Sequence, residues 1–232
     1  MNTQIKAQLA PARLAVITYW PAILAIQCIS LAVVGAYYSL DGAAEFFAMI
    51  AQFKTQGGVI FVMLTTVISG GLLPEVLKRL FSPQAAKPGT KELLHQFLMW
   101  AGVGILVDAF YLLQGVLFAF ESDIGTLLAK ILFDQFVFAP LICIPLIISW
   151  FMLYESHYNL RNWLKQLTPQ NLALRTLPLW LTSLCFWPIM LTTVYSLPAD
   201  LQFPLFLFAN AAYSILMIFI ARSQAELASV SV

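Results

Sequence analysis

Charged side chains are scarce in this sequence. Asp, Glu, Lys and Arg make up 10% of its 232 residues, whereas 61% are hydrophobic. Soluble domains are about one quarter charged and about one half apolar, so a chain of this composition lacks the polar groups to cover its surface in water. The scarcity excludes an ordinary water-soluble domain. A mean hydropathy of +0.85 indicates a chain whose surroundings are mostly lipid.

Cysteine and histidine are also few, and none stands in a metal-binding motif. Cys28, Cys143 and Cys185 are far apart within apolar stretches, and His95 and His157 are isolated. Zinc sites and disulfide frameworks need paired spacings that are missing here. We therefore predict no metal site and expect the three thiols to pack as small hydrophobic side chains.

Motifs of soluble binding and catalysis are missing as well. The net charge is +1 and no basic cluster is interleaved with aromatic residues, so nucleic-acid binding is not predicted. We find no Gly-x-Ser-x-Gly, no His-Glu-x-x-His, no phosphate loop and no dinucleotide glycine pattern. We expect neither an enzyme nor a bound cofactor. Asp134 and His157 would form a catalytic pair only if the loop that carries His157 folded back.

Long apolar runs take up most of the chain. A helix needs about 20 apolar residues to cross the hydrocarbon core of a bilayer. The candidate spans are 14–40, 57–80, 93–120, 124–154, 176–197 and 200–222. A tight turn joins the last two, so five spans is the alternative. We predict an all-α fold, a polytopic transmembrane helix bundle of about six spans that forms one domain over residues 1–232.

Basic residues are distributed unevenly around these spans. With six spans, one side of the membrane receives Lys6, Arg13, Lys78, Arg79, Lys87, Lys91, Arg161, Lys165, Arg175 and Arg222. The other side receives Lys54, and Lys130 lies within a span. Since basic loops stay on the cytoplasmic side, both termini are predicted to be cytoplasmic.

Prolines and glycines predict how the spans bend and touch. Pro140 and Pro188 lie inside the fourth and fifth spans, and each removes one backbone hydrogen bond, which predicts a helix kink. Helices broken in this way line cavities or merely curve to pack, and the sequence leaves both open. Small residues in the second and third spans predict a close contact between them. These are Gly70, Gly71, Gly102, Gly104 and Gly115.

Six polar residues within the third and fourth spans form the candidate site. They are Asp108, Tyr111, Gln114, Lys130, Asp134 and Gln135. Ionisable groups inside a span are costly and by default face the bundle interior or water. Lys130 and Asp134 are four residues apart, so the pair can meet on one helix face. We expect these groups to line a polar pathway, and the alternative is that they join helices as buried bridges.

The stretch from Lys130 to Pro140, KILFDQFVFAP, resembles the signature of the Mpv/PMP family of mitochondrial inner-membrane and peroxisomal membrane proteins. That signature has a Lys, then Asp-Gln, then Ala-Pro at this spacing. Looser similarities follow at Gly71, Gly104, Phe110-Tyr111, Trp187-Pro188, Tyr195 and Leu197-Pro198. The similarity covers 56–222, and 14–55 resembles an added N-terminal span.

The sequence also departs from that family. Pro74 stands where the family has Asp, Ile105 replaces a Pro, and Asp108 stands where the family often has His. Gln202 lies near the position of a family Arg, and the spacing from Trp-Pro to Leu-Pro is one residue short. The resemblance therefore implies the common fold of the family and not an identical selectivity.

The resemblance implies a weakly selective channel for small solutes or ions of unknown identity. The alternative is a membrane scaffold or partner-binding protein whose buried polar pairs act as helix glue. The lipid bilayer is the expected partner, and a homo-oligomer is compatible with the sequence. We expect a bacterial inner membrane, because transit and peroxisomal signals are not found. Mitochondrial inner and peroxisomal membranes are the alternatives.

Overall fold

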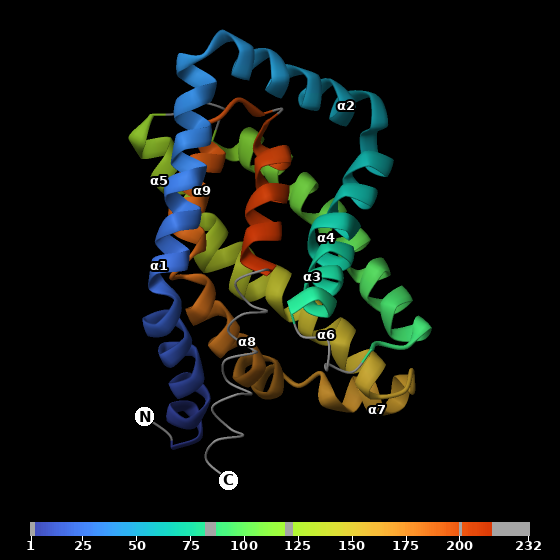
Figure 1. Ribbon diagram of the computed structural model, residues 1–232. Helices are drawn as coiled ribbons and strands as arrows, with labels where there is room; N and C mark the ends of the chain where they lie inside the picture. The colour runs from blue at the N-terminus through green and yellow to red at the C-terminus, as the bar shows by residue number, and fades with distance from the viewer. Residues whose placement is uncertain (1–2, 82–86, 119–122, 200, 215–232) are drawn as a thin grey trace.

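The protein is almost entirely helical. The computed structural model describes residues 3–81, 87–118, 123–199 and 201–214 (Figure 1). Of these, 91% are in helices and none is in a strand. The predicted all-α fold is therefore confirmed for the described residues.

The helices follow one another with short connections. In chain order they are α1 (Thr3–Ser39), α2 (Asp41–Thr66), the π-helix η1 (Val67–Leu72), α3 (Leu73–Phe81), α4 (Thr90–Phe118), α5 (Ile124–Phe133), the π-helix η2 (Asp134–Cys143), α6 (Ile144–Glu155), α7 (Leu160–Gln166), α8 (Pro169–Ser183) and α9 (Trp187–Tyr195). Residues 201–214 form a further helix, drawn in orange-red in Figure 1.

Three of the described helices are long and apolar enough to cross a membrane. They are Asp41–Leu80, Thr90–Phe118 and Ile124–Glu155. A fourth candidate is the pair α8 and α9, which is bent by 65° at a short break. The part of α1 from Ile23 to Ser39 is apolar but shorter. The predicted sixth span, 200–222, extends beyond the described residues.

The helix that carries the second predicted span begins earlier than that span. We predicted a span at 57–80, and α2 begins at Asp41 and bends at Gly58, whose φ is 50° and ψ −134°. Only glycine adopts this conformation readily, so one helical stretch changes direction there without a loop. Figure 1 shows the first half of α2 crossing one end of the bundle before the chain turns down toward α3.

The side chains are arranged with the apolar ones outside and several polar ones inside. Val116 is 83% exposed and Leu141 is 68% exposed, whereas Gln114 and Lys130 are each 1% exposed. Exposed apolar surface on this scale is unfavourable in water. The pattern is the one expected when the outer surface faces lipid and polar groups gather in the bundle interior.

Helices α2 and α4 pack closely, as the glycines predicted. A Cβ added to Gly104 would come within 2.5 Å of Thr66 Oγ1 and 3.0 Å of the Val62 carbonyl oxygen. Gly70, in η1, leaves room for the ring of Trp100 in the same way. Both close approaches need a residue without a side chain, so the predicted contact between the second and third spans is confirmed.

The fifth predicted span, 176–197, is divided into two helices. Helix α8 begins at Pro169, where Thr168 caps it by accepting a hydrogen bond from the Asn171 backbone N–H. It ends at Ser183, and Pro188 lies in the first turn of α9. Proline is tolerated in a first turn because its missing N–H would have no partner there. The break precedes Pro188, and α1 packs against both α8 and α9.

Candidate functional site

Asp134 lies at the centre of a buried polar cluster. It is 7% exposed, at the start of η2. The hydroxyl of Tyr195, from α9, donates a hydrogen bond to Asp134 Oδ2 at 2.6 Å. The neighbouring Gln135 donates from Nε2 to Asp134 Oδ1 at 2.9 Å. A buried carboxylate needs such donors, and they fix its orientation between two elements that are distant in sequence.

The π-helical register of η2 changes which carbonyl Pro140 leaves without a partner. In an α-helix it would be the carbonyl of Phe136. In a π-helix the N–H of residue i bonds the carbonyl of residue i−5, so Pro140 frees the carbonyl of Gln135. The Trp180 indole N–H, from α8, donates to that oxygen at 2.6 Å. A side chain from another helix thus replaces the hydrogen bond that proline cannot make.

Lys130 and Gln114 extend the cluster toward α4. Gln114 donates from Nε2 to the backbone carbonyl of Lys130 at 3.2 Å. The Lys130 Nζ lies 5.9 Å from the centre of the Tyr195 ring, the same ring whose hydroxyl bonds Asp134. Four of the six candidate residues therefore lie around one point where α4, α5, η2 and α9 meet: Gln114, Lys130, Asp134 and Gln135.

Asp108 belongs to a different contact. Its carboxylate lies 2.7 Å from the Nζ of Lys54, and both side chains are about one fifth exposed. The Lys54 Nζ also lies 5.3 Å from the centre of the Phe203 ring. This pair joins α4 to the first half of α2, and Asp108 is not among the residues that line the cavity described next.

A cavity of about 230 Å³, partly open to the outside of the bundle, lies beside the Asp134 cluster. Tyr111, Asp134 and Gln135 contribute to its wall, together with side chains from α6, α8, α9 and the helix 201–214. Tyr111 is buried and meets Tyr195 edge to face, with ring centres 5.5 Å apart. Three of the predicted residues therefore reach one interior space. Gln114 and Lys130 lie next to it, and Asp108 lies apart.

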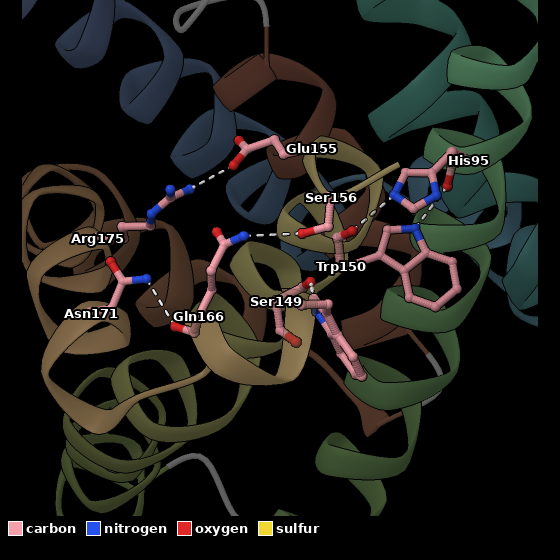
Figure 2. A network of polar contacts seen from close by, with 9 residues as sticks. His95, Ser149, Trp150, Glu155, Ser156, Gln166, Asn171 and Arg175 are labelled. Carbon is pink, nitrogen blue, oxygen red and sulfur yellow. Dashed lines mark hydrogen bonds and ion pairs between the residues drawn. The ribbon is translucent and has the colours of Figure 1, made fainter. Parts of the chain in front are cut away.

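A second polar network ties the helices together at the end of the bundle that holds α7 (Figure 2). The ring of buried His95 stacks on Trp150 with centres 5.0 Å apart, and its Nε2 donates to the Trp150 carbonyl at 2.9 Å. The Trp150 indole N–H donates in return to the His95 carbonyl at 3.0 Å. Gln166 bonds Ser156, and Arg175 pairs with Glu155 at 3.0 Å. This network holds α4, α6, α7 and α8 in fixed register.

His157 and Asp134 do not approach each other. His157 is exposed in the turn after α6, where its φ is 51°. The helix from Asp134 to Glu155 is continuous and about 30 Å long at 1.5 Å per residue, so it holds the two side chains apart. In the described part of the chain, no three His, Cys, Asp or Glu side chains gather closely enough to hold a metal ion.

The sequence did not identify two residues that donate hydrogen bonds to the site. Tyr195 donates to Asp134, and Trp180 donates to the Gln135 carbonyl. Tyr and Trp in apolar stretches are usually assigned to the membrane interface. The signal that was available is the proline, because a freed carbonyl in lipid requires a donor from another helix.

Comparison of the chain with protein-family models, with curated proteins and with solved structures gave no match.

Proposed function

We propose that this protein is a non-enzymatic integral membrane protein that lets small solutes or ions cross with weak selectivity. The observation that supports this proposal is the partly open cavity of about 230 Å³ between the helices, with a buried carboxylate and amide among its lining residues. A polar end within an apolar cavity is suited to holding a solute midway across the bilayer.

The proposed topology has six spans with both termini on the cytoplasmic side. In Figure 1, α1 begins at the same end of the bundle at which α7 lies. Helix α7 and its flanking residues carry Arg161 and Lys165, which belong to the basic side of the predicted topology. The resemblance of 130–140 to the Mpv/PMP signature supports the proposal that the protein belongs to this family. We propose a bacterial inner membrane as its location. A homo-oligomer remains compatible with this function.

The second candidate function is a membrane scaffold, and a specific observation favours it. Polar contacts in the bundle repeatedly join two different elements: Asp134 with Tyr195, Trp180 with the Gln135 carbonyl, and Lys54 with Asp108. Bridges of this kind stabilise helix association without any transport. The two functions differ in whether the charge of Asp134 acts on a solute.

The test is the conductance of the purified protein in a planar lipid bilayer, measured for the wild type and for Asp134→Asn. The passage function predicts currents whose size or ion preference changes in the variant, because Asn keeps the shape and removes the charge. Glu155→Gln is the matched control. It removes an exposed carboxylate paired with Arg175, far from the cavity, and should leave the currents unchanged. Folding of each variant is checked by helical circular dichroism and thermal unfolding. Folded proteins that carry no current would favour the scaffold.

A further inference from the structure

The wall of the cavity has an unusual chemical composition. Six aromatic rings contribute to it, from Trp100, Tyr111, Phe138, Trp187, Phe206 and Tyr213. Asp134 is the charged residue among the described lining residues, and Lys and Arg are absent from them. Aromatic faces attract cations through the negative potential of their π electrons, most strongly where water is excluded. A carboxylate surrounded by aromatic rings therefore favours a positively charged occupant.

The polar atoms beside the cavity mostly accept hydrogen bonds. Each Asp134 oxygen receives one bond from the protein, and an ionised carboxylate has about four acceptor positions in all. Gln135 is 2% exposed and uses its Nε2 on Asp134, and its Oε1 is buried without a hydrogen-bond partner. A buried acceptor left in this way is costly. The Gln135 oxygen is closed off from the cavity, so the acceptor positions open to an N–H donor there are those of the Asp134 carboxylate.

The other charged and titratable groups around Asp134 do not remove the preference of the cavity for a positively charged occupant. Tyr195 donates its hydroxyl to the carboxylate from α9, and Tyr111 is a neutral donor or acceptor on α4. Ser183 from α8 and Asn210 from the last helix add uncharged polar groups to the wall. Lys130 lies one helical turn before Asp134, with its Nζ over the Tyr195 ring, and it is not part of the cavity wall.

The volume indicates the size of the group that the cavity can hold. An apolar cavity of about 150 Å³ in another protein accommodates benzene. The cavity here, of about 230 Å³, has room for one aromatic ring and a short side arm. The polar atoms of Asp134 and Gln135 belong to one part of the wall, whereas aromatic and aliphatic side chains make up most of the rest.

We propose that the cavity binds a small primary or secondary organic ammonium ion whose body is a single ring or a similar apolar group. The ammonium N–H groups would bond the Asp134 carboxylate, and the apolar body would lie among the aromatic rings. The inference deepens the proposed passage function, on which it rests, by naming the class of solute. Binding is measured independently of currents, so the proposed binding and the proposed passage function can each be refuted without the other.

The experiment is titration calorimetry of the purified full-length protein in lipid nanodiscs at pH 7. The probes are phenethylammonium chloride and 2-phenylethanol, which have similar shapes and differ in charge. The wild type should bind the ammonium at least about tenfold more tightly than the alcohol, the difference expected for one charge-assisted hydrogen bond. Equal affinities would overturn the proposal without any variant.

Asp134→Asn should abolish the preference for the ammonium. We expect its affinity for the ammonium to fall at least about tenfold and its affinity for the alcohol to stay unchanged. A damaged fold would weaken both ligands, so the ratio separates the two effects. Ser183→Ala is the control within the same wall, and it should keep the preference because it changes no charge. If the folded Asp134→Asn protein still binds the ammonium more tightly than the alcohol, Asp134 does not hold the ammonium group and the proposal is overturned. Preferential binding without currents would refute passage and leave the binding site standing.

Discussion

The contact between Trp180 and the carbonyl of Gln135 can be tested by a double-mutant cycle with Pro140. Trp180→Phe removes the indole N–H that lies 2.6 Å from this oxygen and keeps an aromatic ring beside Phe136. Pro140→Ala adds a backbone N–H in the position from which a π-helix bonds the same oxygen. The two residues are therefore alternative donors to one acceptor.

The expected magnitude follows from this competition. In the wild-type background, Trp180→Phe leaves the Gln135 carbonyl without its donor, which costs about 1–3 kcal/mol. Hydrogen bonds inside membrane proteins measured by such cycles average about 0.6 kcal/mol and reach about 1.7 kcal/mol. In the Pro140→Ala background the new N–H satisfies the oxygen, so Trp180→Phe should cost less by about 1 kcal/mol.

The assay is reversible unfolding of the purified protein in mixed micelles, followed by helical circular dichroism. The four proteins of the cycle give the coupling free energy, and the loss of indole volume cancels because it occurs in both backgrounds. Costs for Trp180→Phe that agree within about 0.3 kcal/mol in the two backgrounds would refute the reasoning. They would show that Pro140 does not determine the role of Trp180.

Two further predictions concern packing and capping. Gly104→Ala should destabilise the protein by about 1–3 kcal/mol in the same unfolding assay, because its Cβ would overlap Thr66. Gly102→Ala is the control on the same helix, since nothing lies within 4 Å of its Cβ, and an equal loss in both would contradict the packing argument. Hydrogen bonds from the Thr126 side chain and backbone lower the pKa of Asp123, the residue that caps α5. A lowered folded-state pKa gives stability that is present above the unfolded value of about 3.9 and is lost as the pH falls through the folded value. Wild type should therefore lose stability below about pH 4 relative to Asp123→Asn, and parallel pH profiles would contradict this.

Much of the interior could be predicted because charge in an apolar span is costly. Asp134 was selected on that cost, and Gln135 and Tyr111 were added as polar side chains near such a charge; the structure brings the three to one cavity. Lys130 was selected in the same way and is buried. These predictions depend only on the chemical type of a residue and on its place in an apolar run.

The partners could not be predicted, because they depend on helix register and on the ends of helices. We placed Lys54 outside the membrane and Asp108 near the middle of a span. The two meet because α2 begins at Asp41 and continues through Lys54 before it bends at Gly58. An α register would free the carbonyl of Phe136 at Pro140, whereas the π register of η2, which leaves no mark in the hydropathy pattern, frees that of Gln135. Tertiary packing selects that register.

The π-helical segment has a consequence for how this gene can change. A π turn holds one more residue than an α turn, and the chain continues as helix on both sides of η2, from Ile124 to Glu155. Deleting one residue there can return one turn to the α register and leave the rotation of α6 relative to α5 unchanged, so that Trp150 still faces His95. Deleting a residue from an α-helical part of the same span would instead rotate everything after it by about 100°. Single-residue gaps among related sequences should therefore be tolerated within η2 and eliminated by selection in α5 and α6.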